Sequence, residues 1–327
     1  TRHRFCSTRR ARSGGSFLWN LLMTQARSGV GLVLVACIIW GVAPMYYRLL
    51  GHVSTAELMA HRTVWSLVIF GTMLALRGQL PALTRLRQNP EFGRIAMAAA
   101  LISFNWFAFI WAVQRGHAVE AGLGYYIFPL MAVLIGVVSL GERLSRLQGV
   151  AVGLAALAVG VLTWGLGVAP WLALALAASF AAYSRIKRGL VTAAAVSVTA
   201  EVALIFPFAM GWLVWLQISG QSTFGHDLKA TALLPVAGLI TAGPLILFST
   251  GAQRVRMSTL GLVQYLNPTL QIGCATLIMG DAFTRWHVAA LALIWAALAM
   301  YSAESWRQDR AARKAVVSSA TSAATLK

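Results

Sequence analysis

The sequence has few acidic residues, few charged residues of any kind and little cysteine. Asp and Glu number 9 in 327 residues, and charged residues make up 11% of the chain, against about 25% in soluble domains. This composition excludes an ordinary water-soluble domain. The three cysteines, Cys6, Cys37 and Cys274, have no paired spacing, so neither a disulfide framework nor a cysteine metal site is expected.

The common catalytic and nucleotide-binding patterns are also missing. The chain has no HExxH, GxSxG or P-loop pattern, and no Cys/His cluster with metal-ligand spacing. We therefore expect no metal, no cofactor and no ATP drive within this chain. Among the functional classes, an intramembrane enzyme is the least favoured.

What the chain has in abundance is apolar sequence, with 58% hydrophobic residues and a mean hydropathy of +0.71. A membrane-spanning helix needs roughly 20 apolar residues, because each residue adds about 1.5 Å of length. The sequence therefore predicts an all-α polytopic membrane protein without a sizeable soluble domain. Ten apolar runs predict ten transmembrane helices, at 29–50, 55–76, 93–114, 118–140, 146–165, 168–186, 194–217, 230–252, 257–279 and 286–305.

The 27 Lys and Arg residues, which give a net charge of +18, lie almost entirely between or outside these runs. Basic segments beside membrane helices are retained on the cytoplasmic side. With ten spans and a cytoplasmic N-terminus, the outside segments hold only Arg48, Arg115, Lys229 and Arg285. We predict an inner (plasma) membrane protein with both termini in the cytoplasm. Because membrane orientation explains the charge, no nucleic-acid partner is expected.

The chain also repeats itself at an offset of 139 positions. A repeat unit of five helices is odd, so equivalent segments face opposite sides of the membrane, as in the inverted repeats of secondary transporters. Gly122, Tyr126 and Pro129 recur in this way as Gly261, Tyr265 and Pro268.

The repeat divides the chain into four predicted parts. They are a basic, disordered tail at 1–28, a first five-helix repeat at 29–166, a second repeat at 167–306 and a basic cytoplasmic tail at 307–327. Met23 is a hypothetical true start, which would make residues 1–22 non-native.

A set of short motifs resembles a known family. In chain order they are Ile39-Trp40-Gly41, His61-Arg62, Asn105-Trp106, Leu123-Gly124-Tyr125-Tyr126, Gly141-Glu142-Arg143 and Gln264-Tyr265 with Asn267-Pro268. This set resembles the RarD-type permeases of the EamA family, within the drug/metabolite transporter superfamily. The resemblance implies a ten-helix inner-membrane permease with paired EamA repeats and an association with chloramphenicol sensitivity. Phe128 departs from the pattern, which has Asn before the first-half proline.

Charged groups inside the predicted helices are candidates for the site, because burying them in a membrane is costly. Arg62 and Glu201 are the two clear cases, and they occupy equivalent places in the two repeats. We interpret them as a charge pair at a central cavity; the alternative is two separately solvated, snorkelling groups. Glu201 is also a candidate proton carrier, which makes protons a candidate partner.

Further polar and aromatic residues are expected beside this pair. The alternative for the whole set is ordinary hydrogen bonding and kinking between helices. The predicted substrate-binding residues are Asn105, Trp106, Tyr126, Gln264, Tyr265, Asn267, Trp40 and His61, and the predicted kink or packing positions are Pro129, Pro268, Gly122 and Gly261.

The function favoured by the inverted repeat is secondary transport. We expect a permease that moves a small metabolite or drug-like solute by alternating access, with export as its direction. Its expected partners are a small-molecule substrate and the lipid bilayer, and it acts as a monomer or a homodimer. A non-transporting membrane receptor or a channel is the alternative.

Overall fold

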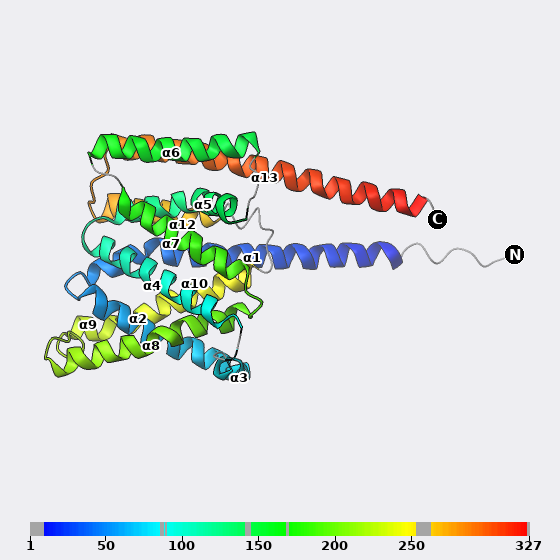
Figure 1. Ribbon diagram of the computed structural model, residues 1–327. Helices are drawn as coiled ribbons and strands as arrows, with labels where there is room; N and C mark the ends of the chain where they lie inside the picture. Colours follow the sequence, from blue (N-terminus) through cyan, green and yellow to red (C-terminus); the bar gives the residue numbers. More distant parts are fainter. Residues whose placement is uncertain are drawn as a thin grey trace.

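The computed structural model describes the backbone of residues 10–85, 88, 90–140, 145–167, 170–252 and 263–325, and the regular structure in these ranges is helical (Figure 1). Most of it belongs to long helices that run side by side. These are α1 (Arg10–Leu49), α2 (Thr55–Leu76), α4 (Phe92–Gln114), α5 (Ala118–Leu140), α6 (Arg146–Leu166), α7 (Trp171–Arg188), α8 (Ala194–Ile218), α10 (Val236–Ala252) and α13 (Arg285–Thr325). The shorter elements are α3 (Leu80–Thr84), α9 (Leu228–Leu233), α12 (Leu266–Gly273) and the π-helical segment Cys274–Ile278.

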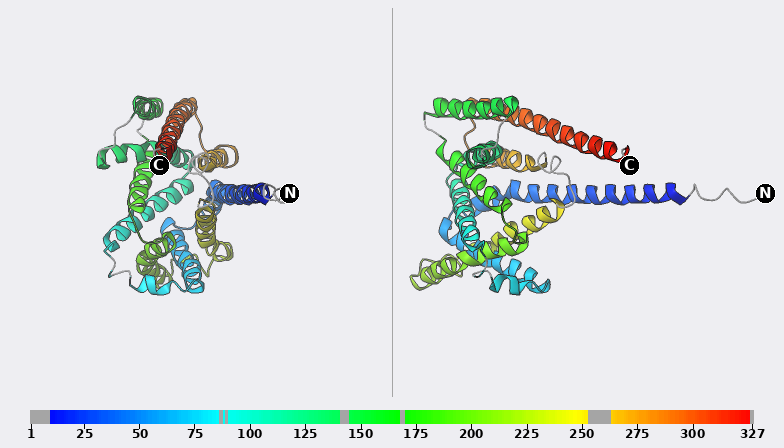
Figure 2. Two further views of the ribbon diagram at one scale, coloured as in Figure 1. Left: turned by 90° about the vertical axis from the view of Figure 1, so that its right-hand side faces the viewer. Right: turned by 45° about the vertical axis from the view of Figure 1, so that its right-hand side comes forward.

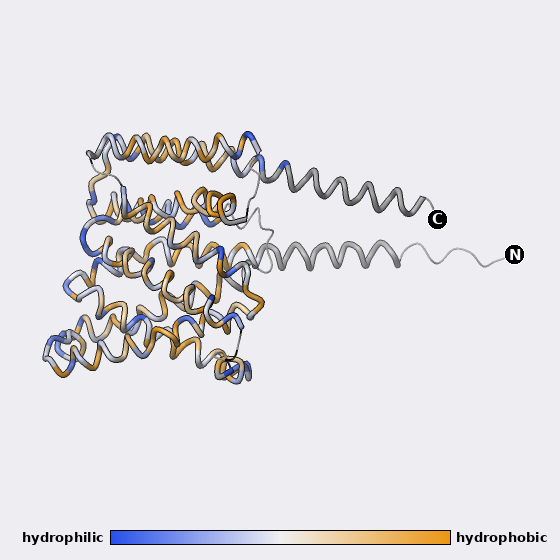
Figure 3. The backbone as a smooth tube through the Cα atoms, in the orientation of Figure 1, coloured by the Kyte–Doolittle hydropathy of each residue, from blue (hydrophilic) through white to orange (hydrophobic). Residues whose placement is uncertain are grey.

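Eight stretches of the described chain are long and apolar enough to cross a membrane. The prediction of an all-α polytopic membrane protein is therefore confirmed, and Figure 3 shows hydrophobic residues along the helices of the bundle, with hydrophilic residues mainly at their ends and in the loops. The eight stretches are Ser28–Leu49, Thr55–Leu76, Phe92–Gln114, Ala118–Val138, Arg146–Gly165, Ala194–Ile218, Leu228–Phe248 and Arg285–Glu304.

The predicted count of ten spans is not reached in the described residues. The segment predicted at 168–186 forms α7, whose last turn carries Arg185, Lys187 and Arg188 and leaves fewer apolar residues for a span. The segment predicted at 257–279 is described only from residue 263, as α12 and the π-helical turn that follows it.

Local sequence sets several helix ends. Ser54 caps α2 by accepting a hydrogen bond from the Glu57 amide, and Ser145 with Gln148 forms a capping box at the start of α6. Pro235 lies between α9 and α10 and has no amide hydrogen to continue the ladder. The single helix predicted at 230–252 is therefore two helices.

Helix packing follows the 139-residue offset. Helix α1 packs against α10 and α12, and α7, its counterpart under the offset, packs against α4 and α5. The equivalent pairs α2–α8 and α6–α13 also pack together (Figures 1 and 2). This arrangement puts α6 and α13 at one edge of the bundle and leaves the other long helices around its centre.

The outer parts of α1 and α13 extend from the same side of the bundle (Figures 1 and 2). Here the structure differs from the expected disordered tail at 1–28, because residues 10–28 continue α1 as helix. Extending a helix that already exists adds one hydrogen bond per residue without the cost of nucleation, which explains the continuation. Residues 1–9 of the predicted tail lie outside the described residues.

Glycine allows close approach at the centre of the bundle. A Cβ on Gly122 would lie 2.7 Å from Ile272 Cγ1, and a Cβ on Gly124 would lie 2.8 Å from the carbonyl oxygen of Ala173. Helix α5 therefore packs against α12 on one side and α7 on the other at distances that exclude a larger side chain.

Candidate functional site

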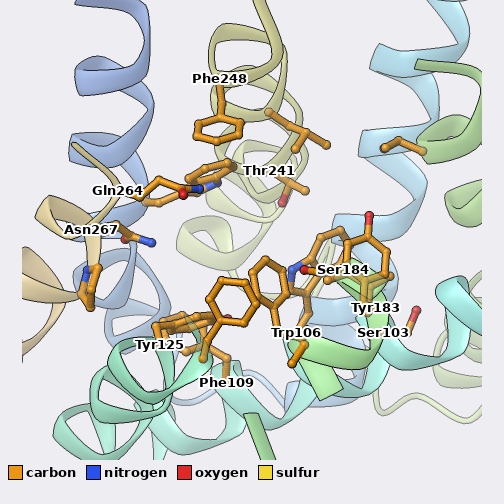
Figure 4. Close-up of a pocket in the computed structure, with 18 of the residues that line it drawn as sticks. Ser103, Trp106, Phe109, Tyr125, Tyr183, Ser184, Thr241, Phe248, Gln264 and Asn267 are labelled. Atoms are coloured by element: carbon orange, nitrogen blue, oxygen red, sulfur yellow. The ribbon is translucent and has the colours of Figure 1, made fainter. Parts of the chain in front are cut away.

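A cavity of about 860 Å³ lies inside the bundle, among α1, α2, α4, α5, α7, α8, α10 and α12 (Figure 4). This volume is typical of sites for drug-sized small molecules. Much of the wall is aromatic. The aromatic lining residues are Trp40, Tyr47, Trp106, Phe109, Tyr125, Phe128, Phe180, Tyr183, Phe248, Tyr265 and Tyr301.

Arg62 lines this cavity from α2 and is itself 6% exposed. Its Nε donates to Thr241 Oγ1 at 2.5 Å, and its guanidinium carbon lies 3.6 Å from the centroid of the Trp106 ring. Thr241 in turn donates to the carbonyl of Ala237 on the same helix, α10. The guanidinium is thus held between a hydroxyl and an aromatic face, an arrangement that stabilises a cation without neutralising it.

Glu201 lines the same cavity from α8 and is 3% exposed. Its carboxylate lies 2.6 Å from Lys187 Nζ and also accepts hydrogen bonds from Tyr183 and Ser197. The predicted charge pair with Arg62 is therefore wrong in its partner, since Glu201 pairs with Lys187. The reason is local: α7 and α8 are consecutive, and the last turn of α7 brings Lys187 beside Glu201.

Most of the other predicted residues line the cavity with Arg62 and Glu201. Figure 4 shows Gln264 and Asn267 near Phe248 and Thr241, with Trp106, Tyr125 and Phe109 gathered nearby. The predicted residues that line the cavity besides the two charges are Trp40, Trp106, Gln264, Tyr265, Asn267, Pro129 and Pro268.

Asn105 does not line the cavity and is 0% exposed. Its amide nitrogen donates to the Leu176 carbonyl and to Ser179 Oγ, and its amide oxygen accepts from the Tyr125 hydroxyl. Asn105 therefore joins α4 to α5 and α7 and holds Tyr125 in the cavity wall. It positions the site and does not contact the space within it.

Tyr126 and His61 also lie outside the cavity lining. The Tyr126 hydroxyl forms a hydrogen bond with Thr269, and its ring stacks on that of Tyr265. The His61 ring packs on Phe224 with 4.7 Å between centroids. Both side chains are buried; Tyr126 packs α5 against the start of α12, and His61 packs α2 against the loop between α8 and α9.

The two predicted glycines have separate outcomes. Gly122 has the packing role that the sequence predicted, since it admits Ile272 of α12. Gly261 lies outside the described residues.

The polar lining residues Ser66 and Arg185 were not predicted as part of the site, whereas Gln271 is recognisable from the sequence as a polar residue on the same helical face as Gln264 and Pro268. Three buried polar atoms of lining residues have no hydrogen-bond partner among the described residues: Ser66 Oγ, Gln271 Oε1 and Arg185 Nε. Ser66 follows Arg62 by four positions, so helical periodicity was a usable signal. Thr241 and Lys187 gave no such signal, because their roles depend on contacts between helices.

Comparison with known proteins decides the family. Residues 27–164 match the EamA-like transporter family. A RarD protein of Streptomyces exfoliatus is 42% identical over 291 residues, covering 88% of this chain and 92% of its own length. The chain belongs to the RarD group of the EamA-like transporter family.

A more distant RarD relative comes from Pseudomonas aeruginosa. It is 31% identical over 89% of this chain and 98% of its own length, and its name reads "Chloramphenicol-sensitive protein RarD". A crystal structure at 20% identity covers 84% of this chain and 97% of its own, with a TM-score of 0.55, and this likeness concerns the fold alone. As a member of the RarD group the chain is a multi-pass membrane permease, and the cavity is its candidate transport site.

Proposed function

We propose that this permease is a secondary transporter that carries a small organic solute across the plasma membrane by alternating access, in the direction of export. The observation that carries the proposal is the central cavity, which is lined by equivalent helices of the two predicted repeats. Helices α1, α2, α4 and α5 contribute from the first, and their counterparts α7, α8, α10 and α12 contribute from the second, together with Tyr301 of α13.

The packing of these helices supports alternating access. In an inverted repeat, the contacts that close one side of the site have counterparts that close the other, so rocking one half exchanges the two states. The pairs α1–α12 and α7–α5 are such counterparts under the 139-residue offset. The predicted cytoplasmic position of both termini agrees with their emergence on one side of the bundle.

Proton coupling through Glu201 stays part of the proposal, in a modified form. Lys187 Nζ lies 2.6 Å from the Glu201 carboxylate, so the proposed coupling includes breaking and re-forming this ion pair in each transport cycle. The expected result is that Glu201→Gln abolishes the acceleration of uptake by a pH gradient. Unchanged gradient-driven uptake at normal expression would exclude this coupling.

Transport itself is tested in two steps. Metabolites that accumulate differently in deletion and overexpressing cells are identified first, and each is then used as a labelled probe in proteoliposomes containing the purified full chain. A secondary transporter gives saturable flux and counterflow. Ion current without saturation would favour a channel, and binding without flux would favour a receptor.

A further inference from the structure

We infer that the cavity takes an amphipathic organic anion, whose carboxylate binds Arg62 and Ser66 and whose apolar body lies against the aromatic wall. This inference rests on the proposed function, because it names the class of substrate that the transport site accepts. Its basis is a buried cation next to a buried hydroxyl, the first without an acidic partner and the second without a hydrogen-bond partner in the part of the chain that the structure describes.

Arg62 has unused hydrogen-bonding capacity. A guanidinium carries five N–H donors, and in this structure Nε donates to Thr241 while Nη1 faces the Met59 sulfur at 3.7 Å. Thr241 is uncharged, and the Trp106 face leaves the net charge in place. The remaining N–H groups have the fork geometry that matches a carboxylate.

No carboxylate in the described part of the chain pairs with Arg62, because the acids there have other partners. Glu201 pairs with Lys187, which therefore adds no net positive charge beside the cavity. Away from the cavity, three acids accept hydrogen bonds from backbone amides: Glu57 from Thr223 and Phe224, Glu91 from Val191 and Thr192, and Asp281 from Ala118. The other three form ion pairs: Asp227 with His52, Glu120 with His117 and Glu304 with Arg307.

The charge balance of the lining is therefore positive. Glu201 and Lys187 neutralise each other, which leaves Arg62 and Arg185 as the charges on the wall that have no acidic partner among the described residues. Burying an unpaired cation at membrane depth is costly, and a bound anion relieves that cost. A cationic solute would meet repulsion from both arginines.

Ser66 supplies the second contact. It lies one helical turn after Arg62 on α2, lines the cavity and is 2% exposed, and its hydroxyl has no hydrogen-bond partner among the described residues. A carboxylate on the guanidinium can accept from this hydroxyl with its second oxygen. The pair then resembles other anion sites in which a charged fork is joined by a neutral donor.

The apolar part of the solute follows from the rest of the wall. Trp106, on whose ring the Arg62 guanidinium lies, gathers with Phe109 and Tyr125, and Phe248 lies across the space from them (Figure 4). Aromatic side chains favour flat apolar groups by stacking and edge contacts. The class of ligand is thus a monocarboxylate with a planar or aromatic body.

The experiment uses the purified full chain in lipid nanodiscs and two matched sets of probes. One set is 3-phenylpropionate, its amide and 3-phenylpropylamine; the other is 1-naphthylacetate, its amide and the corresponding amine. We expect the carboxylates to raise the melting temperature and the neutral and cationic analogues to leave it unchanged. Probes are used at concentrations up to about 10 mM, so that binding with a Kd of about 1 mM is detected.

Variants assign the effect to residues. Arg62→Gln should weaken carboxylate binding by about tenfold or more, and Ser66→Ala should weaken it less, because a charged donor contributes more than a neutral one. Arg62→Lys keeps the charge without the fork and should fall between Arg62→Gln and the native chain. The matched control is Arg115→Gln, which makes the same change of charge at a residue that packs over Trp111 outside the cavity.

Three outcomes would overturn the inference: no carboxylate binding in either set, equal binding of the amides or amines, or full binding by a folded Arg62→Gln protein. Counterflow separates this inference from the proposed function. Flux of the amides or amines would retain the transporter and overturn the anion site. Carboxylate binding that depends on Arg62 without any flux would retain the anion site and overturn transport.

Discussion

Lys187 and Glu201 form an ion pair of 2.6 Å in which the glutamate side chain is 4% exposed and the lysine side chain 19% exposed. Taking both charges out of water is expensive, and their attraction offsets most of that cost. Tyr183 and Ser197 satisfy further lone pairs of the carboxylate. The net contribution of the intact ion pair to the free energy of unfolding is therefore smaller than the decrease expected when only one of the two residues is replaced.

This balance predicts the behaviour of single and double substitutions. Glu201→Gln leaves a buried ammonium without its counterion and should lower the free energy of unfolding by about 3 kcal/mol. Lys187→Met combined with Glu201→Leu removes both charges and should recover most of that loss. Equilibrium unfolding of the purified protein in mixed micelles measures both values.

Glu120→Gln is the matched control, because it makes the same chemical change in a carboxylate that lies 4.0 Å from His117 with its side chain 25% exposed. The Glu120 carboxylate also accepts hydrogen bonds from the amides of Leu172 and Ala173, and the side-chain oxygen of glutamine can still accept from them. The expected cost is therefore about 1 kcal/mol or less. A double substitution no more stable than Glu201→Gln would contradict the expected balance between desolvation and attraction.

Single residues also show what the sequence can and cannot predict about a site. Arg62 and Glu201 were recognisable because charge inside an apolar run is rare whatever the fold. Their partners were not recognisable: Thr241 lies 179 positions from Arg62 in the chain, and Lys187 sits at the end of a different helix from Glu201. Asn105 was recognised as polar and buried, but only the contacts with Ser179 and Tyr125 reveal that it serves the wall.

At the scale of the elements, α5 occupies the most restricted position. It packs against α7 and α12 and carries Tyr125, whose hydroxyl is bound to Asn105. At Gly124 the neighbouring atom is a backbone carbonyl of α7, which cannot move aside as a flexible side chain can. The spacing of α5 and α7 therefore depends on the absence of one methyl group.

Gly124→Ala should separate α5 from α7 and lower the free energy of unfolding by about 1–3 kcal/mol. Because α5 carries Tyr125, the same substitution should weaken binding of any cavity ligand. Thermal unfolding in nanodiscs gives the first quantity and ligand-induced stabilisation gives the second.

Gly71→Ala is the control, since a Cβ there has no atom within 4 Å and alanine is the better helix former. It should leave stability unchanged or raise it by about 1 kcal/mol at most. Equal effects at the two glycines would show that helix propensity, not close packing, decides the outcome.

Hydropathy predicted the elements well where a helix is uniformly apolar. The span predicted at 230–252 is found as the stretch Leu228–Phe248, but hydropathy did not show that Pro235 divides it into α9 and α10. Hydropathy also predicted a span at α7, although this helix is only weakly apolar. Its polar and basic residues face the cavity and Glu201. A helix that lines a polar site loses the signal by which spans are recognised.

At the scale of the whole molecule, the distribution of basic residues predicts which side each loop occupies. His226 is exposed in the connection between α8 and α9, predicted to face outside, and Gln79 is exposed in the connection between α2 and α3, predicted to face inside. The two positions lie in loops and do not line the cavity.

In a cysteine-free chain, His226→Cys should react with a membrane-impermeant maleimide in intact cells, and Gln79→Cys should react only after permeabilisation. The two cysteine variants control for each other, because His226→Cys reports on the outside of the membrane and Gln79→Cys reports on the inside. Reaction of Gln79→Cys in intact cells would reverse the predicted orientation, and reaction of both would contradict a fixed topology.

The guanidinium of Arg62 has a consequence for the charge that each transport cycle moves across the membrane. If the cavity carries an anion and returns empty, each cycle moves negative charge across the membrane. An inside-negative potential of 100 mV favours outward movement of that charge by about 2.3 kcal/mol, which corresponds to a concentration ratio of about 50-fold. The membrane potential would then favour export of the bound anion, as a direct consequence of a cavity in which Arg62 selects negative charge.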